Sequence, residues 1–348
     1  HSGCIAIDYS KNKAKLKQIR RKFMKAIIYD KYGSTDVLQF REVGKPVPTD
    51  NEVLIKVYST TATAAEQMMR TGKPYWGRII LGIRKPKKKY RILGIELAGE
   101  IESTGKDVKR FKKGDQVFGF TGFRPGACAE YMCLPEKSSL ALQPTGLSSE
   151  ESAAIVDGAT TSLFFLRDKG NIRSGQNVLI IGASGSIGTS AVQLAKHFEA
   201  NVTGVCSTAN VALVKSLGAD KVIDYTKEDF TKSGATWDII FDTVGKSSFS
   251  RCKTSLSKNG SYLPTTGLIN NVLMLWTALI GGKRVKTGMS VEKNEALLYL
   301  KELIEAGKIK SVIDRQYPLE HAAEAHRYVE KGHKKGNVVI TVRPNNKT

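Results

Sequence analysis

The sequence predicts an α/β protein in which a doubly wound parallel sheet is joined to a second domain of short strands. The first observation is the run NVLIIGASGSIG at residues 177–188, a buried-type strand that leads through glycines into a helix. The second is the alternation of strand and helix patterns that follows it, which is typical of a parallel sheet. The third is the series of short strands and turns between Met24 and Gln143, which is typical of an all-β, barrel-like unit.

The glycine turn is the most informative part of the predicted sheet. A parallel strand that opens through glycines onto a helix lets the backbone approach a pyrophosphate and aims the helix N-terminus at it. Further strands are predicted at residues 202–205, 219–224, 237–242 and 260–267. This framework favours a dinucleotide site over a turn in which the glycines serve packing alone.

The two ends of the chain complete the domain prediction. Residues 1–23 carry seven Lys or Arg against the single Asp8 and are interpreted as a basic N-terminal extension. Helices are predicted at 296–306 and 322–330, and a last strand at 337–342 is expected to return to the first domain. The predicted domains are therefore 24–145 with 290–348, and 146–289, with the ligands expected in the cleft between them.

Composition narrows the class of protein. The chain has 348 residues and 41% hydrophobic residues, which is enough for two cores and excludes a disordered chain. No apolar run is long enough to span a membrane. The five cysteines form no Cys-x-x-Cys pair, so a reducing, cytoplasmic setting is expected. The formal charge of +21 permits association with nucleic acid, but no aromatic and basic pattern of an RNA-binding module is present, so nucleic acid is not the expected partner.

Several separate motifs, in order, resemble one known family. They include KAIIY from Lys25, LGIELAGEIESTG from Leu93, KGDQVFG from Lys113, GACAEY from Gly126 and the glycine turn itself. The chain resembles the medium-chain dehydrogenase/reductase superfamily and, within it, the zinc-independent quinone oxidoreductase branch, the branch of zeta-crystallin. The resemblance implies a GroES-like β-barrel catalytic domain, a Rossmann nucleotide-binding domain, and reduction of quinones or α,β-unsaturated carbonyls.

The zinc ligands of the superfamily are missing. Its zinc-containing members use a Cys, a His and a third ligand, and the matching positions here hold Thr63, Ile95 and Asp157. A hydroxyl and an alkyl group leave too few ligands for a tetrahedral site, so no catalytic metal is predicted. Asp157 is expected to cap the helix or to bond locally.

The cofactor is predicted to be NADPH. A site that selects NAD places Asp or Glu at the end of the second strand, about 20 residues beyond the glycines, where this chain has CSTAN. Without a carboxylate to repel a 2′-phosphate, and with hydroxyl and amide donors present, NADPH is favoured. Asn210 stands where NADPH-dependent relatives often have a lysine, so the selectivity is expected to be modest.

Further site residues are implied by the resemblance. Those implied to contact the cofactor are Ala183, Ser184, Gly185, Ser186, Ile187, Ser207, Asn210, Tyr225, Thr243, Leu263 and Thr265. Those implied at the reaction site are Thr63, Met68 and Thr161, of which Thr63 and Met68 replace residues common in the branch and so predict an altered acceptor pocket. For Thr243 and Thr265, a buried hydroxyl bonded to backbone is an equal alternative.

Partners and alternative functions follow from the same residues. Residues 75–89 mix aromatic, aliphatic and basic side chains, which is typical of a lid over the cleft or of a segment that rests on an anionic membrane surface. The resemblance implies a homodimer or tetramer, with the apolar residues 268–280 as a candidate contact. The alternative functions are an NAD(P)-dependent alcohol dehydrogenase-like enzyme, and a basic nucleic-acid or membrane-surface binding protein that retains NADPH binding.

Overall fold

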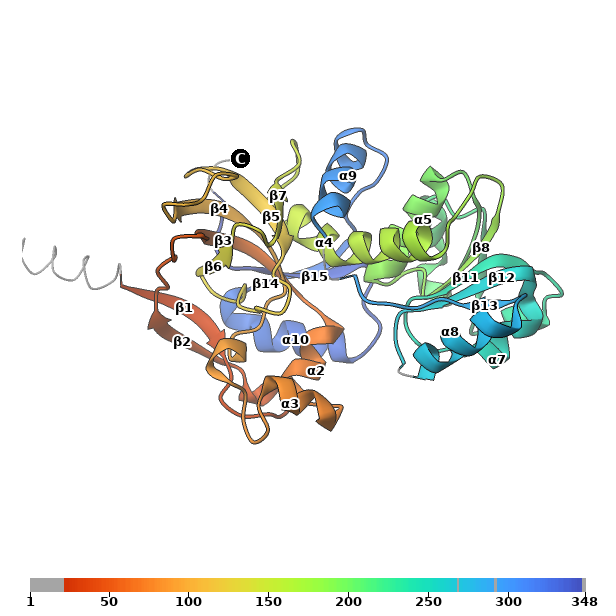
Figure 1. Cartoon of the computed structure of the whole chain (residues 1–348), viewed down its shortest axis with the longest axis horizontal. Helices are drawn as coiled ribbons and strands as arrows, with labels where there is room; N and C mark the ends of the chain where they lie inside the picture. The colour runs from red at the N-terminus through yellow and green to blue at the C-terminus, as the bar shows by residue number, and fades with distance from the viewer. Residues whose placement is uncertain (1–21, 268, 291–292, 346–348) are drawn as a thin grey trace, which may run out of the picture. The chain divides into compact units, whose positions relative to one another are not determined.

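The computed structural model describes residues 22–267, 269–290 and 293–345, so most of the predicted basic extension lies outside the described residues. The described chain forms two compact units (Figure 1). Unit 1 contains the residues up to Leu142 together with Gln316–Glu330 and the residues from Val339 onward, and unit 2 contains Gln143–Arg315 and Lys331–Val338.

Unit 1 is built mainly from antiparallel strands, as the pattern of short strands and turns predicts. The strands are β1 (Phe23–Ile28), β2 (Gln39–Gly44), β3 (Glu52–Ala62), β4 (Glu96–Thr104), β5 (Gln116–Phe120), β6 (Tyr131–Pro135), β7 (Ser139–Leu142), β14 (Ile313–Pro318) and β15 (Asn337–Thr341). β1 and β2 form a separate pair, while the larger sheet runs β14-β15-β3-β4-β5-β7, with β6 also paired to β3. The chain passes between the units within β14 and β15. Alternate residues of β3, among them Val53, Ile55 and Val57, point into the core.

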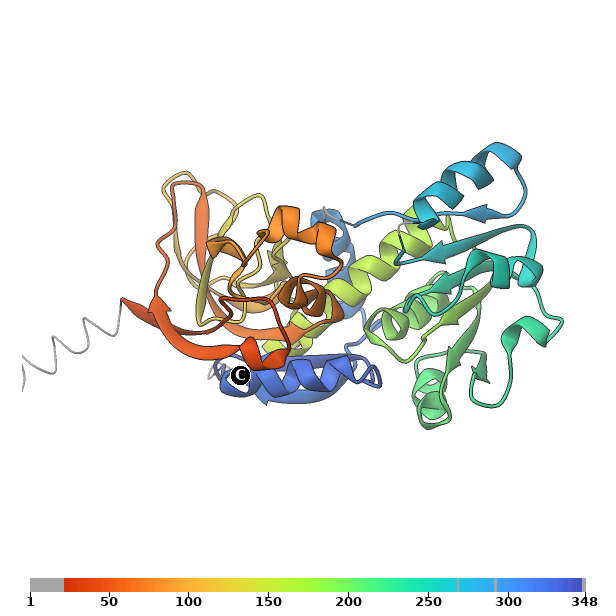
Figure 2. The ribbon, with the colours of Figure 1, turned by 90° about the horizontal axis from the view of Figure 1, so that it is seen from below.

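Three helices accompany the strands of unit 1, and two of them position buried side chains. They are α2 (Ala64–Thr71), α3 (Arg78–Leu81) and α10 (Ala322–Glu330). α10 lies against α2 and β3, along one side of the unit (Figure 2). Because its buried residues include Ala325, His326 and Val329, this helix brings an imidazole into the interior.

Unit 2 contains the predicted doubly wound sheet. Its strands are β8 (Asn177–Ile181), β9 (Asn201–Cys206), β10 (Lys221–Asp224), β11 (Trp237–Asp242), β12 (Leu256–Pro264) and β13 (Arg284–Val285). They pair in the order β10-β9-β8-β11-β12-β13, and every pair is parallel. β8 is apolar and buried from Val178 to Ile181, as a strand covered on both faces must be. The strands predicted from the sequence are confirmed, with shifts of a few residues at their ends.

Helices cover both faces of the parallel sheet. They are α4 (Ser149–Leu163), α5 (Ser186–His197), α6 (Val211–Ser216), α7 (Phe249–Cys252), α8 (Ile269–Ile280) and α9 (Asn294–Glu305). α5 and α8 lie on opposite sides of the sheet in Figure 1. Doubly wound folds of this kind bind ligands beyond the carboxyl ends of the strands. A ligand site is therefore expected at the residues that follow β8 and β9.

The predicted division of the C-terminal part is wrong in two places. The sequence predicts that residues 290–348 belong to the strand-rich domain, whereas the described residues up to Arg315, and Lys331–Val338, lie in unit 2. For the first stretch the reason is the apolar face of α9, because Leu297 and Leu300 are buried, α9 packs on α4, and Glu305 accepts a 2.9 Å hydrogen bond from the backbone N–H of Thr145. The helical pattern was visible in the sequence, but the partner of its apolar face was not.

Candidate active site

The glycine turn after β8 is shaped by its first and last glycines. Gly182 has φ +79°, in the left-handed region that favours glycine, and its N–H and that of Ala183 both donate to the carbonyl of Val205 at 3.0 Å. A Cβ on Gly188 would lie 2.1 Å from the carbonyl oxygen of Gly182, so only glycine lets α5 pack this closely. Gly182 and Gly188 thus serve the turn and the packing.

The middle of the turn is open to a ligand. Gly185 is the N-cap of α5 and provides no side chain to cap the helix, so the first N–H groups of this 12-residue helix are available to an anion. The nearest atom to a Cβ built on Gly185 is 3.5 Å away, which leaves room beside the backbone. Ala183 is fully buried and its N–H is bound to Val205, so it shapes the turn without being exposed to a ligand. This geometry fits a pyrophosphate.

A segment far along the chain holds the turn in place. The N–H of Gly336 donates to the carbonyl of Ser184 at 2.8 Å, and the hydroxyl of Ser186 donates to the side-chain oxygen of Asn337. The N–H of Asn337 in turn donates to the carbonyl of Val312 at 2.8 Å. Sequence reasoning missed Asn337, because no local pattern shows which distant segment meets a loop.

Asn210 organises the residues beyond β9, where the adenosine end of a dinucleotide is expected. Its amide nitrogen donates to the hydroxyls of Ser184 at 3.0 Å and Ser207 at 3.2 Å. Both amide hydrogens are therefore used, while the buried Oδ1 has no hydrogen-bond partner within the described part of the chain. Ser207 accepts from Asn210 and keeps its own hydrogen for a ligand.

A carboxylate that sequence reasoning overlooked lies one strand further on. Asp224 ends β10 and accepts hydrogen bonds from the hydroxyls of Thr208 and Thr226, which hold the pKa of its carboxyl below the usual range. The ammonium of Lys227 lies 3.8 Å away. The negative charge of Asp224 is thus balanced by donors and a cation of the protein. Tyr225, the next residue and a predicted cofactor contact, is 58% exposed.

The threonines implied near the nicotinamide use their hydroxyl hydrogens within the protein. Thr243 donates to the carbonyl of Ile181 at 2.8 Å and Thr265 to that of Asp242 at 3.2 Å. The buried-hydroxyl alternative describes Thr243, whereas Thr265 is bonded to backbone but only half-buried. Each oxygen keeps a lone pair as an acceptor. Leu263 is fully buried in β12 and packs in the core, so the structure does not expose this predicted cofactor-contact residue to a ligand.

The position of the third zinc ligand is occupied by an ion pair. Asp157, in α4, pairs with the ammonium of Lys293, whose side chain is only 1% exposed. The hydroxyl of Thr161, one turn further along α4, donates to the same carboxylate at 3.3 Å. Asp157 does bond locally, as expected, although the buried lysine partner was not foreseen.

In unit 1, the positions of the other two zinc ligands serve the fold. Thr63 is the N-cap of α2 and forms a capping box with Glu66, donating to the carboxylate at 3.0 Å and accepting from the Glu66 N–H at 3.4 Å. Ile95 is buried. Met68, on the same helix as Glu66, is 52% exposed. Among the residues implied at the reaction site, which are Thr63, Met68 and Thr161, it is the most exposed.

Two apolar surfaces remain exposed on the separate units. Residues 75–83 in unit 1 expose Tyr75, Trp76, Ile79, Ile80 and Ile83, each more than half exposed. In unit 2, α8 exposes Ile269, Val272, Leu275, Trp276, Leu279 and Ile280, while Leu268 lies outside the described residues. Among the helices that the structure describes, none has the length and apolar character needed to cross a bilayer.

Comparison with known proteins identifies the family. The model of the alcohol dehydrogenase GroES-like domain matches residues 49–144, and that of the zinc-binding dehydrogenase matches residues 217–340. A chloroplastic quinone oxidoreductase of Triphysaria versicolor, QR1, is 35% identical over 335 residues, which is 92% of this chain and 98% of that protein. The chain belongs to the medium-chain dehydrogenase/reductase superfamily, in its quinone oxidoreductase branch.

Two further relatives in this superfamily bear on the site. The 2-methylene-furan-3-one reductase of Solanum lycopersicum is 31% identical over 91% of this chain and 79% of its own length. The solved structure of Escherichia coli quinone oxidoreductase complexed with NADPH matches with a TM-score of 0.78 and 25% identity, over 91% of this chain and 99% of that one. The fold predicted from the sequence is confirmed by these likenesses and by the parallel sheet.

Proposed function

We propose that this protein is an NADPH-dependent reductase that transfers hydride to quinones or α,β-unsaturated carbonyls without a catalytic zinc. The observation that carries the proposal is the open glycine turn of unit 2. The turn combines helix N–H groups that no side chain caps with a second strand, β9, that is followed by Ser207 instead of an acid. The relatives named for quinone and enone reduction support the substrate class.

The residues of unit 2 fit the cofactor. The backbone from Ser184 to Ile187 would hold the pyrophosphate, and the Ser207 hydroxyl, oriented by Asn210, would donate to the 2′-phosphate. The relative solved with NADPH supports this assignment. When bound, NADPH supplies a hydride at its nicotinamide ring.

The donor set does not fit a catalytic zinc. Thr63 uses its hydroxyl as a helix cap, Ile95 offers an alkyl group, and Asp157 is paired with the ammonium of Lys293. A tetrahedral zinc needs at least three protein ligands with free lone pairs. The chemistry must then suit an acceptor that delocalises its own negative charge, as quinones and enones do, and the protein supplies positioning and exclusion of water.

Steady-state kinetics tests this proposal directly. Oxidation of NADPH and of NADH is followed with quinones, enals and simple ketones, and we expect turnover with the first two classes only. The Ser207→Ala variant should raise KM for NADPH several-fold and leave NADH unaffected, whereas Ser216→Ala, at the far end of α6, should change neither. Efficient reduction of simple ketones or oxidation of alcohols would favour the alcohol dehydrogenase alternative, and a clear NADH preference would refute the cofactor assignment.

Residues 75–89 support a second, independent proposal, contact with an anionic lipid surface. Five large apolar side chains of this segment are exposed, and the cations Arg84, Lys85, Lys87, Lys88 and Lys89 follow them directly. Aromatic and aliphatic side chains next to a cluster of cations are the combination that binds the interface of an anionic bilayer. A lipophilic acceptor dissolved in the bilayer would then reach the enzyme by diffusion in two dimensions.

Co-sedimentation with vesicles tests the lipid contact. We expect binding to vesicles containing phosphatidylserine and much weaker binding to vesicles of phosphatidylcholine alone, with loss on addition of salt. The variant Ile79→Ser with Ile80→Ser should lose binding, and Val47→Ser, at an even more exposed apolar position outside the segment, should keep it. Binding to an RNA of matched charge but not to vesicles would support the nucleic-acid alternative instead.

Assembly and location stay predictions from the sequence. The exposed apolar face of α8 supports contact with a second copy of the chain, and sedimentation analysis of Leu275→Lys with Leu279→Lys checks it, since these charges would separate a dimer formed through that face. A cytoplasmic location is checked by cell fractionation, because QR1, the relative from Triphysaria, is named as chloroplastic.

A further inference from the structure

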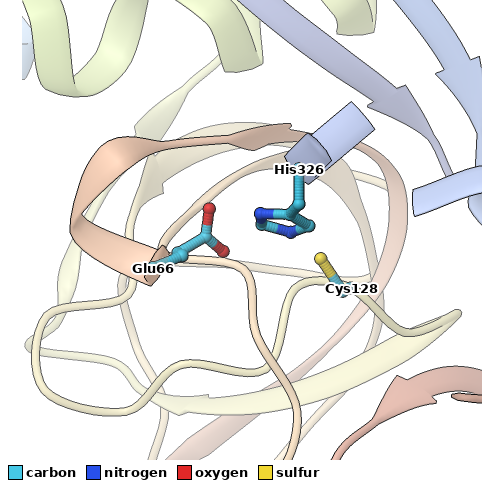
Figure 3. Close-up of side chains that lie close together, drawn as sticks. All are labelled: Glu66, Cys128 and His326. Atoms are coloured by element: carbon cyan, nitrogen blue, oxygen red, sulfur yellow. The ribbon is translucent and has the colours of Figure 1, made fainter. Parts of the chain in front are cut away.

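Three side chains from distant parts of the chain meet in the interior of unit 1. Glu66 lies on α2, Cys128 precedes β6, and His326 lies on α10; each is at most 1% exposed. One ligand atom from each residue lies within 4.8 Å of those of the other two. Figure 3 shows the imidazole between the Glu66 carboxylate and the Cys128 sulfur.

The surrounding backbone fixes the carboxylate. One oxygen of Glu66 accepts from the N–H of Gly94 at 2.5 Å, and the other accepts from the N–H of Thr63 at 2.8 Å. The guanidinium of the fully buried Arg70 binds the carboxylate of Glu330, so α2 and α10 are tied together beside the three side chains. The three groups are therefore held in place by structure outside themselves, as ligands of a metal are.

The imidazole lacks the partner that a buried polar group needs. Nε2 of His326 is buried and has no hydrogen-bond partner among the described residues. Burial, and then the charge of Arg70, lower the pKa of this imidazole to about 4, so it is neutral at pH 7. A neutral imidazole with a free ring nitrogen is the form that binds metal ions, and an unpaired buried polar atom destabilises the fold unless a ligand satisfies it.

We propose that Glu66, Cys128 and His326 form a binding site for a divalent cation of the zinc class, distinct from the catalytic zinc position of the superfamily. The donors are a carboxylate oxygen, a sulfur and an imidazole nitrogen, which are the ligand types of zinc. Three protein ligands leave a fourth position for water.

The charges of the site balance when the cation is bound. Binding displaces the proton of the Cys128 thiol into solvent and forms the metal–thiolate bond, with no change of oxidation state. The two charges of the cation then meet the charges of the thiolate and of Glu66, while Arg70 stays paired with Glu330. Burial raises the pKa of the free thiol, so the site holds no thiolate before the metal arrives.

Cobalt substitution tests the site on the full chain. We expect the purified protein, after treatment with chelator and dialysis against Co²⁺, to bind one equivalent and to show a thiolate-to-cobalt charge-transfer band in the near ultraviolet. Cys128→Ser should lose the band, and His326→Gln should weaken binding of Co²⁺ and Zn²⁺ at least 10-fold. Cys252→Ser, which removes a buried cysteine of unit 2, should keep both properties.

A second measurement uses the unaltered protein, so its result does not depend on whether a variant folds. Addition of Zn²⁺ to the unaltered protein at pH 7 should release one proton per ion bound. No charge-transfer band and no proton release would overturn the proposal. So would a cobalt band that persists in Cys128→Ser.

The result for the new metal site can be distinguished from the result for the proposed zinc-free reduction. Zinc held by a catalytic site would be lost in Asp157→Asn and kept in Cys128→Ser, whereas zinc held by the new site shows the opposite pattern. A protein that binds no metal would leave the proposed zinc-free reduction intact and overturn the new site alone.

Discussion

The glycine turn of unit 2 and the buried set of unit 1, which is formed by Glu66, Cys128 and His326, differ in the groups that they offer to a ligand. The turn uses backbone N–H groups and the absence of side chains, and its residues are consecutive, from Gly182 to Gly188. The buried set uses only side chains, and these come from three elements far apart in the sequence. One site depends on local backbone conformation and the other on tertiary packing, so they should respond differently to substitution and to pH.

The largest effect is expected at Gly188. A Cβ there would lie 2.1 Å from the Gly182 carbonyl oxygen and 2.7 Å from Cα of Ala183, so Gly188→Ala must push α5 away from the turn. We expect NADPH affinity, measured by fluorescence titration, to fall about 100-fold, or about 3 kcal/mol. Wild-type affinity in this variant would contradict the role of the turn.

Gly185→Ala is the matched control for that substitution. The nearest atom to its added Cβ is at 3.5 Å, an ordinary contact, so the melting temperature should stay unchanged while NADPH affinity falls about 10-fold through lost space for the pyrophosphate. The comparison separates a glycine needed for packing from one needed for the ligand.

A smaller effect is expected from acid, and it concerns the buried set. His326 has a pKa of about 4 in the fold and about 6.5 when unfolded, so between these values the unfolded chain binds more protons. The contribution to stability is present above pH 6.5 and is lost as pH falls toward 4. From pH 7 to pH 5 we expect a loss of about 2 kcal/mol in the free energy of unfolding, measured in urea with chelator present.

His326→Gln should lack this part of the pH dependence. His321→Gln, at an exposed histidine whose pKa is raised by Glu324, should keep it. Equal pH dependence in the wild type and in His326→Gln would show that the buried imidazole is not responsible.

The smallest effect is expected at Asn210. Asn210→Asp places a carboxylate beside Ser207, where it would repel a 2′-phosphate. We expect the ratio of kcat/KM for NADPH to that for NADH to fall about 10-fold, or about 1.4 kcal/mol. Asn201→Asp, at the opposite end of β9, should leave the ratio unchanged, and an unchanged ratio in both variants would remove Asn210 from the specificity site.

Sequence reasoning succeeded where the signal is local. The order of strands and helices and the glycine turn follow from periodicity and from glycines at fixed offsets, so they were predicted nearly as the structure has them. It failed for α9, whose apolar face gives no indication of the unit it covers. Sequence reasoning also could not find Asn337, Lys293 and the buried set, because each acts through a contact with a residue distant in the chain.

The contact between the glycine turn and Gly336 has a consequence for biosynthesis. A ribosome releases the chain from its N-terminus, so the turn at residues 182–188 leaves the exit tunnel long before the N–H that binds the Ser184 carbonyl has been made. During that interval the nascent chain holds an unfinished nucleotide pocket. Full affinity for the cofactor is therefore expected only after the chain has been synthesised almost to its last strand. Truncation before Gly336 should yield a folded sheet that binds NADPH more weakly.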